Sequence, residues 1–142
     1  MKIMLNAALR PLMAAALILL AAAPATAQAP ILDATRTVPV RFARGASSAT
    51  MKGMVRGYDT VDYVLGAREG QRLTAALRTS NSFAYFTVLP PGDPTAPEGG
   101  ATTRDYSGVL TASGDWRVRV FLMRNAARRG ERASYTLTTA IR

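Results

Sequence analysis

The sequence contains no cysteine and no histidine. These absences exclude disulfide bonds, thiolate and imidazole metal sites, cysteine nucleophiles and catalytic triads that use histidine as the base. Lysine is also scarce, because Lys2 and Lys52 are the only two. Nine acidic residues face eighteen basic ones, so the 142-residue chain carries a formal charge of +9, most of it from arginine. A chain of this length forms one domain, and its composition favours a binding protein over an enzyme.

Hydrophobic residues are concentrated at the N-terminus. Lys2 and Arg10 supply positive charge there, and Leu12–Ala23 is an unbroken apolar run. A proline and the small residues Ala25-Thr26-Ala27 follow, in the form that signal peptidase accepts. The apolar run is shorter than the roughly 18 residues that a membrane-spanning helix needs. We therefore predict a signal peptide over residues 1–27, export, and no membrane attachment after cleavage.

The exported chain keeps a basic excess. Loss of Lys2 and Arg10 with the signal peptide leaves sixteen basic and nine acidic residues, a charge of +7. Such a charge favours an anionic partner, which could be nucleic acid, an anionic surface polymer or an acidic cleft on another protein. Export makes nucleic acid the least favoured of the three, so we expect no nucleic-acid partner. Without cysteine, packing has to supply all of the stability.

From residue 38 onward, apolar and polar residues alternate in short segments bounded by Gly, Asn, Asp and Ser. A period of two is typical of β-strands, and no segment shows the 3.6-residue period of a long helix. Strands are predicted over about residues 38–44, 50–56, 61–65, 73–77, 83–89, 105–111, 115–123 and 133–141. In the seventh, Trp116, Val118 and Val120 are expected to face the core, while Arg117 and Arg119 face the other way. Leu137 and Ile141 are expected in the same core.

Residues 90–103 hold four prolines and three glycines, which excludes a regular element. We expect this segment to cross from one sheet to the other. The predicted fold is therefore all-β, an antiparallel β-sandwich of about eight strands in two sheets rather than a closed barrel. The sandwich domain is placed at residues 38–142, after a flexible lead-in over residues 28–37. A long exposed edge strand leaves both a monomer and a weak dimer open.

Candidate catalytic groups are few. Asp59 and Asp62 are the closest pair of carboxylates, but Asp59 suits a turn and Asp62 is expected to form a salt bridge with an arginine. Two carboxylates alone make a poor metal site. Ser47, Ser48 and Ser113 have no histidine to act as a base and suit turns as well. We therefore expect no catalytic residue, no metal and no cofactor.

Residues 124–132, with the sequence RNAARRGER, are the most informative stretch. They predict a basic loop with almost no apolar side chain to bury. One interpretation is a solvated connector whose arginines keep the protein soluble. The other is a loop that binds an acidic ligand, because a guanidinium grips a carboxylate in a forked geometry. Arg124 and Arg128 would share a face if the loop contained one helical turn.

Several short motifs in this chain resemble those of the periplasmic inhibitors of goose-type lysozyme from Gram-negative bacteria. Each motif alone is weak, but their order and spacing behind a signal peptide are specific, and the resemblance runs from about Val40 to Ile141. It departs from the family pattern at Trp116, where the family has a tyrosine. The motifs are Arg41-Phe42, Gly45-x-Ser47-Ser48-Ala49, Gly57-Tyr58-Asp59, Asp62-Tyr63, Gly70-Gln71, the stretch from Ser113-Gly114 through Trp116 to Val120, and Arg124-Asn125-x-Ala127-Arg128.

The resemblance implies a periplasmic β-sandwich that plugs the substrate cleft of a goose-type lysozyme and performs no chemistry itself. It implies a partner-binding site made of Tyr58 and Asp59 in one turn and of Arg124, Asn125 and Arg128 in the basic loop. An arginine placed against the catalytic glutamate would hold that carboxyl ionised, so that it could not donate its proton.

An alternative is an exported β-sandwich module that binds glycan or an anionic cell-envelope polymer and inhibits nothing, because a fold does not fix a function. Glycan-binding faces display several exposed aromatic side chains, whereas Trp116 alternates with core residues.

The inhibitor hypothesis also makes a structural prediction. Tyr58 and the basic loop have to lie at the same end of the sandwich, with Arg124 and Arg128 exposed and unpaired.

Overall fold

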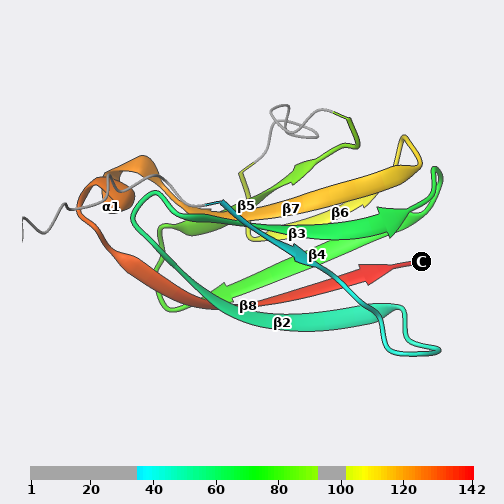
Figure 1. Ribbon diagram of the computed structural model, residues 1–142, viewed down its shortest axis with the longest axis horizontal. Coiled ribbons are helices and arrows are strands. Elements are labelled where there is room, and N and C mark those ends of the chain that lie inside the picture. The colour runs from blue at the N-terminus through cyan, green and yellow to red at the C-terminus, as the bar shows by residue number, and fades with distance from the viewer. Residues whose placement is uncertain (1–34, 93–101) are drawn as a thin grey trace, which may run out of the picture.

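The computed structural model describes residues 35–92 and 102–142, which form eight strands and one short helix. The strands make two four-stranded sheets, in the orders β1-β3-β7-β5 and β2-β8-β4-β6, which lie face to face (Figure 1). The predicted sandwich of eight strands in two sheets is therefore confirmed. The elements are β1 (Thr35–Pro39), β2 (Ser48–Arg56), β3 (Thr60–Ala67), β4 (Arg72–Thr79), β5 (Ala84–Leu89), β6 (Asp105–Val109), β7 (Gly114–Leu122), α1 (Arg124–Arg128) and β8 (Arg132–Ile141).

The core lies between the two sheets and follows the alternation of the sequence. Trp116, Val118 and Val120 of β7 are fully buried, and Leu137 and Ile141 of β8 are buried opposite them. The predicted register of both strands is confirmed. Burying one large apolar side chain stabilises a fold by about 1.5–3 kcal/mol, so this core replaces the disulfides that the chain lacks.

The first strand differs from the prediction. β1 begins at Thr35, inside the segment expected to be a flexible lead-in, and residues 40–44 lie in a loop instead of continuing the strand. β1 also pairs with β3 in parallel, with Thr35 opposite Thr60, whereas the other strand pairs in the described part are antiparallel. A parallel pair needs a crossover, which β2 in the other sheet supplies. The predicted signal peptide and residues 28–34 lie outside the described residues.

The basic segment is not the plain loop that was predicted. Arg124–Arg128 form α1, and Ala126 and Ala127 are buried against the core. Alanine is the strongest helix former and the smallest residue with a side chain, so these two positions both favour the helix and let it pack closely against the core. Gly130 follows in the left-handed region at φ 66°, which glycine adopts without strain.

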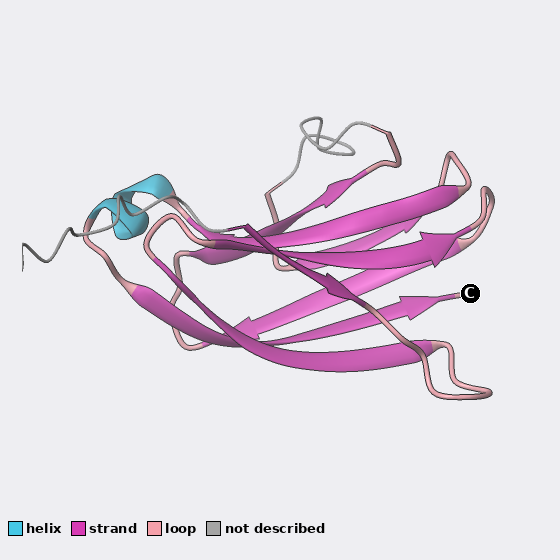
Figure 2. Ribbon diagram, viewed as in Figure 1, coloured by secondary structure: helices cyan, strands magenta, loops and turns pink. Residues whose placement is uncertain are grey.

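The helix joins β7 to β8 at one end of the sandwich (Figure 2). At five residues, it agrees with the prediction that the strand region contains no long helix. The segment after β5 connects the two sheets as predicted, since β5 and β6 belong to different ones. Within the two described ranges, no helix is long and apolar enough to cross a membrane.

Candidate functional site

The turn between β2 and β3 is tied directly to the segment that follows α1. The backbone N–H of Gly57 donates to the carbonyl oxygen of Glu131 at 2.9 Å, and the N–H of Asp59 donates to the carbonyl of Arg56 at 3.0 Å. Gly57 has a φ of 58°, a left-handed conformation that favours glycine. The β2–β3 turn, which carries Tyr58, and α1 therefore lie at the same end of the sandwich, as predicted (Figure 1), although five strands separate them in the chain.

Tyr58 is an exposed aromatic ring between two grooves. Its exposed fraction is 47%, and the neighbouring Met123 is 39% exposed. One groove, of about 650 Å³, is lined by Tyr58, Met123 and Arg124 together with residues of β3 and β7. The other, of about 790 Å³, is lined by Tyr58, Arg128 and the two turns that flank them. The structure thus places the predicted tyrosine between two adjacent grooves, with Arg124 lining one and Arg128 lining the other.

Arg124 and Arg128 are exposed, and within the described residues neither side chain forms a hydrogen bond or an ion pair. Four positions apart on one helical turn, they lie on the same side of α1. The expectation that both guanidinium groups are exposed and unpaired is confirmed. All five donors of each group remain available to a partner.

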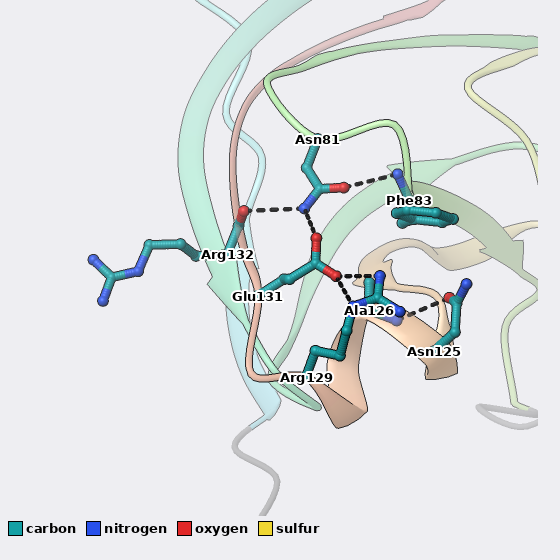
Figure 3. A network of polar contacts seen from close by, with 7 residues as sticks. All are labelled: Asn81, Phe83, Asn125, Ala126, Arg129, Glu131 and Arg132. Atoms are coloured by element: carbon teal, nitrogen blue, oxygen red, sulfur yellow. Dashed lines mark hydrogen bonds and ion pairs between the residues drawn. The ribbon is translucent and has the colours of Figure 1, made fainter.

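The neighbouring Arg129 has a different environment, shown in Figure 3. Its Nε donates to the Oε2 atom of Glu131 at 2.7 Å, and its guanidinium carbon lies 5.5 Å from the centre of the Phe83 ring. The Nδ2 of Asn81 donates to the other carboxylate oxygen of Glu131 at 3.2 Å. The one acidic residue of the basic segment is therefore bound by Arg129 and Asn81, and it does not neutralise Arg124 or Arg128.

The two remaining predicted site residues have local roles. Asn125 is exposed, and its Oδ1 accepts a hydrogen bond from the backbone N–H of Ala126 at 2.8 Å, in the first turn of α1. Asp59 is half-buried in the turn beside Tyr58. Both residues support the two elements that carry Tyr58 and the arginines, which agrees with the interpretation of Asp59 as a turn residue.

The second carboxylate of the predicted pair, Asp62, lies on β3 and is completely buried. Arg119 grips it with two hydrogen bonds, from Nε at 2.6 Å and from Nη2 at 2.8 Å, and Arg117 approaches to 3.7 Å. The hydrogen bond to Asp62 raises the pKa of Arg119, against the opposing effect of burial. The predicted salt bridge is confirmed. A carboxylate bound in this way is an acceptor only, so it cannot serve as a general acid.

Sequence reasoning missed Met123 and the difference between Arg128 and Arg129. Met123 lies between the end of β7 and the start of α1, where the alternation of outward-facing residues in β7 ends. An apolar residue at this position was the sequence signal that could have identified it. The pairing of Arg129 depends on Asn81, which comes from a turn far away in the sequence, and no local pattern announces it. Among the described residues, no group of three or more acidic side chains could hold a metal ion.

Comparison with known proteins gives a consistent set of relatives. A curated protein of Escherichia coli (strain K12) described as an inhibitor of g-type lysozyme is 32% identical over 113 residues, which cover 77% of this chain and 84% of the relative. The crystal structure of Aeromonas hydrophila PliG, described as a periplasmic lysozyme inhibitor of g-type lysozyme, is 40% identical with a TM-score of 0.69. It matches over 78% of this chain and 100% of its own.

A second crystal structure, of Salmonella Typhimurium PliG with the same description, is 28% identical with a TM-score of 0.59, over 75% of this chain and 98% of its own. A scan of family models returned no match. These relatives are described as inhibitors and not as enzymes.

Proposed function

Because the chain belongs to the family of periplasmic inhibitors of g-type lysozyme, we propose that it inhibits a g-type lysozyme in the periplasm by occupying the substrate cleft with Tyr58, Arg124 and Arg128. Residues 1–27 act as the signal peptide that delivers it there. The contact with Tyr58, Arg124 and Arg128 is proposed on one observation. Two exposed guanidinium groups without a partner in the described residues lie beside an exposed tyrosine at one end of the sandwich.

The arginines complement the chemistry of a glycosidase cleft. Such a cleft holds a carboxylic acid that must be protonated to donate its proton to the leaving oxygen. A guanidinium in contact with this carboxyl lowers its pKa and keeps it ionised. The charge-assisted hydrogen bond contributes about 1.5–3 kcal/mol net. Arg124 and Arg128 reach the partner without first breaking a bond inside the inhibitor, because neither is paired in the described structure.

Tyr58 and Met123 supply the apolar part of the contact. An exposed tyrosine brings a large, rigid ring with a polar tip and loses little conformational entropy on binding. Met123 lines the same groove as Tyr58 and Arg124, and its flexible side chain adapts to an irregular surface. Inhibition then results from steric exclusion of the glycan and from loss of the protonated acid, without any chemistry by the inhibitor.

The test is inhibition of a purified g-type lysozyme, measured as the clearing of bacterial cell walls. We expect the Arg124→Ala, Arg128→Ala double variant to inhibit at least tenfold more weakly than the unaltered protein, since truncating one partner of a buried charge pair costs about 2–5 kcal/mol. The thermal midpoint should stay nearly unchanged, as it does for most surface substitutions.

Arg129→Ala is the matched control, because it removes the same side chain from the adjacent position but from a paired environment. We expect this variant to inhibit almost as well as the unaltered protein. If the double variant inhibits normally, the two arginines have no part in the mechanism. If neither the variants nor the unaltered protein inhibits any g-type lysozyme, the proposed function itself is wrong for this chain.

A further inference from the structure

Four cations gather on the outer face of the sheet that contains β2, β8 and β4, on the half nearest α1. We call this the basic face; it consists of Lys52 and Arg56 on β2, Arg132 on β8 and Arg78 on β4, and all four residues are exposed. They alternate with buried or half-buried residues of the same strands, so they project from the side of the sheet opposite the core.

The strand register brings these charges together. Arg56 lies directly opposite Arg132, and Thr136 lies between Lys52 and Arg78 in one row across three strands. Like charges directly opposite each other in an antiparallel pair destabilise a sheet. The pairing of Arg56 with Arg132 therefore lowers the stability of the fold, which favours a role for these cations in binding a partner.

In the two described ranges, no acidic side chain forms an ion pair with the four cations. Within the described residues, none of the four side chains forms a hydrogen bond or an ion pair. Arg72, on the same face of β4, donates instead to Ser107 at 3.3 Å. Figure 3 shows the side chain of Arg132 extending away from the network around Glu131. Asp105 is the outward acidic residue on the described strands of this sheet, and it lies on β6, opposite Ala76 and not opposite a cation.

An exposed apolar side chain lies among the cations. Met54 sits between Lys52 and Arg56 on β2 and opposite Ser134. Its exposed fraction of 54% is the highest of the large hydrophobic side chains in the described ranges. Cations surrounding an exposed apolar group are typical of surfaces that rest on anionic lipid headgroups, where the apolar group enters the headgroup boundary.

We propose that the basic face is a docking surface for an anionic lipid membrane. Each cation gains from the negative surface potential, and Met54 gains from leaving water. A soluble polyanion would use the cations but would gain nothing from the methionine. The contact is peripheral, so it needs no spanning helix, and none occurs in the described residues. It revises the expectation from the sequence that the protein does not contact a membrane after cleavage of the signal peptide. It goes beyond lysozyme inhibition, and Arg56, which also lines the groove beside Tyr58, joins the two surfaces.

The experiment is sedimentation of the mature protein with vesicles made of equal amounts of phosphatidylcholine and phosphatidylglycerol, and with vesicles of phosphatidylcholine alone. We expect binding to the anionic vesicles that weakens with added salt, and little binding to the neutral ones. A Lys52→Thr, Arg78→Thr variant keeps residues that favour strands. Its partitioning should be about thirtyfold weaker, since each of the two cations contributes about 1 kcal/mol near the surface. Met54→Ser should also weaken binding to vesicles.

The matched control is Arg41→Thr, Arg44→Thr, which removes the same charge from the loop before β2, at the other end of that strand. It should bind vesicles nearly as well as the unaltered protein. Equal losses in both double variants would mean that net charge alone acts, which would overturn the proposal. Binding to polyglutamate but not to anionic vesicles would also overturn it, in favour of a polymer. Lysozyme inhibition by the Lys52→Thr, Arg78→Thr variant should be unchanged, which keeps this test separate from the proposed function.

Discussion

Two groups of arginines follow each other closely in the chain and meet opposite environments. Arg117 and Arg119 on β7 converge on the buried carboxylate of Asp62, whereas Arg124 and Arg128 on α1 have no partner within the described residues. The residue type is the same, and only a few positions separate the two groups. An arginine that has a counter-ion inside the fold therefore stabilises the fold, whereas an arginine without such a counter-ion stays available to a binding partner.

Burial explains why the first pair is fixed. An ionised carboxylate inside a protein is costly unless charged and hydrogen-bonding groups surround it. Arg119 supplies two short hydrogen bonds to Asp62, so the pair is stable only when both members are present. The α1 arginines carry no such constraint, and the fold should tolerate their loss.

The largest expected effect on stability is at Asp62. Asp62→Ala removes the carboxylate that accepts two hydrogen bonds from Arg119 on a partly buried strand face, and we expect a loss of about 2–3 kcal/mol in the free energy of unfolding. Inhibition by the fraction that remains folded should be unchanged. Urea denaturation together with the lysozyme assay measures both. A variant of normal stability would contradict this expectation, because the pairing of Arg117 and Arg119 with Asp62 would then not stabilise the fold.

The next effect is at Tyr58, on the binding side of the comparison. Tyr58→Ala should leave the urea midpoint almost unchanged, since the ring is half exposed. Inhibition should weaken by at least tenfold, as expected for an aromatic residue at the centre of an interface. The conservative Tyr58→Phe should retain most of the inhibition if the ring acts mainly by filling a subsite. Full inhibition by Tyr58→Ala would place the contact elsewhere.

Two buried tyrosines extend the comparison to the core. The hydroxyl groups of Tyr63 and Tyr135 form a hydrogen bond at 2.8 Å. Burial is the larger cause that raises the pKa of Tyr135, and this hydrogen bond is the second. As the pH rises, Tyr135 therefore ionises in the unfolded chain, near pH 10, before it ionises in the folded protein. The stabilising effect is complete below that pH and is lost above it, at about 1.4 kcal/mol for each pH unit.

Urea denaturation of the unaltered protein and of Tyr135→Phe, at neutral and at alkaline pH, tests this expectation. Above pH 10 the unaltered protein should lose stability more steeply than the variant. Parallel losses in the two proteins would contradict the assignment of the pKa shift to Tyr135.

The smallest expected effect concerns Arg129, which follows α1 and is compared with Arg128. Arg129→Ala removes an exposed ion pair with Glu131 and a contact over the Phe83 ring, which together stabilise the fold by about 1 kcal/mol or less. Thermal denaturation should show a small decrease, and inhibition should stay within threefold of the unaltered protein. A loss of inhibition as large as that of Arg128→Ala would mean that pairing does not separate the two arginines.

The sequence predicted the parts of the fold that depend on local alternation. Trp116, Val118 and Val120 alternate with arginines, and this pattern alone assigns the buried face of β7. The parallel partner of β1 and the pairing of Arg129 with Glu131 and Asn81 were out of reach, because they depend on contacts between distant segments. The helical turn of α1 was only a conditional expectation, and the burial of Ala126 and Ala127 was missed, because charged residues surround these two alanines in the sequence.

The central claim is that an α1 arginine contacts the catalytic glutamate of the lysozyme. A double-mutant cycle tests it most directly, with affinities measured by calorimetry for the unaltered inhibitor and the Arg124→Ala, Arg128→Ala variant against the lysozyme and its catalytic Glu→Gln variant. We expect the two changes not to be additive, with a coupling energy of about 1.5 kcal/mol or more. Additive losses would show that the arginines do not contact the glutamate, and would contradict the proposed mechanism of inhibition.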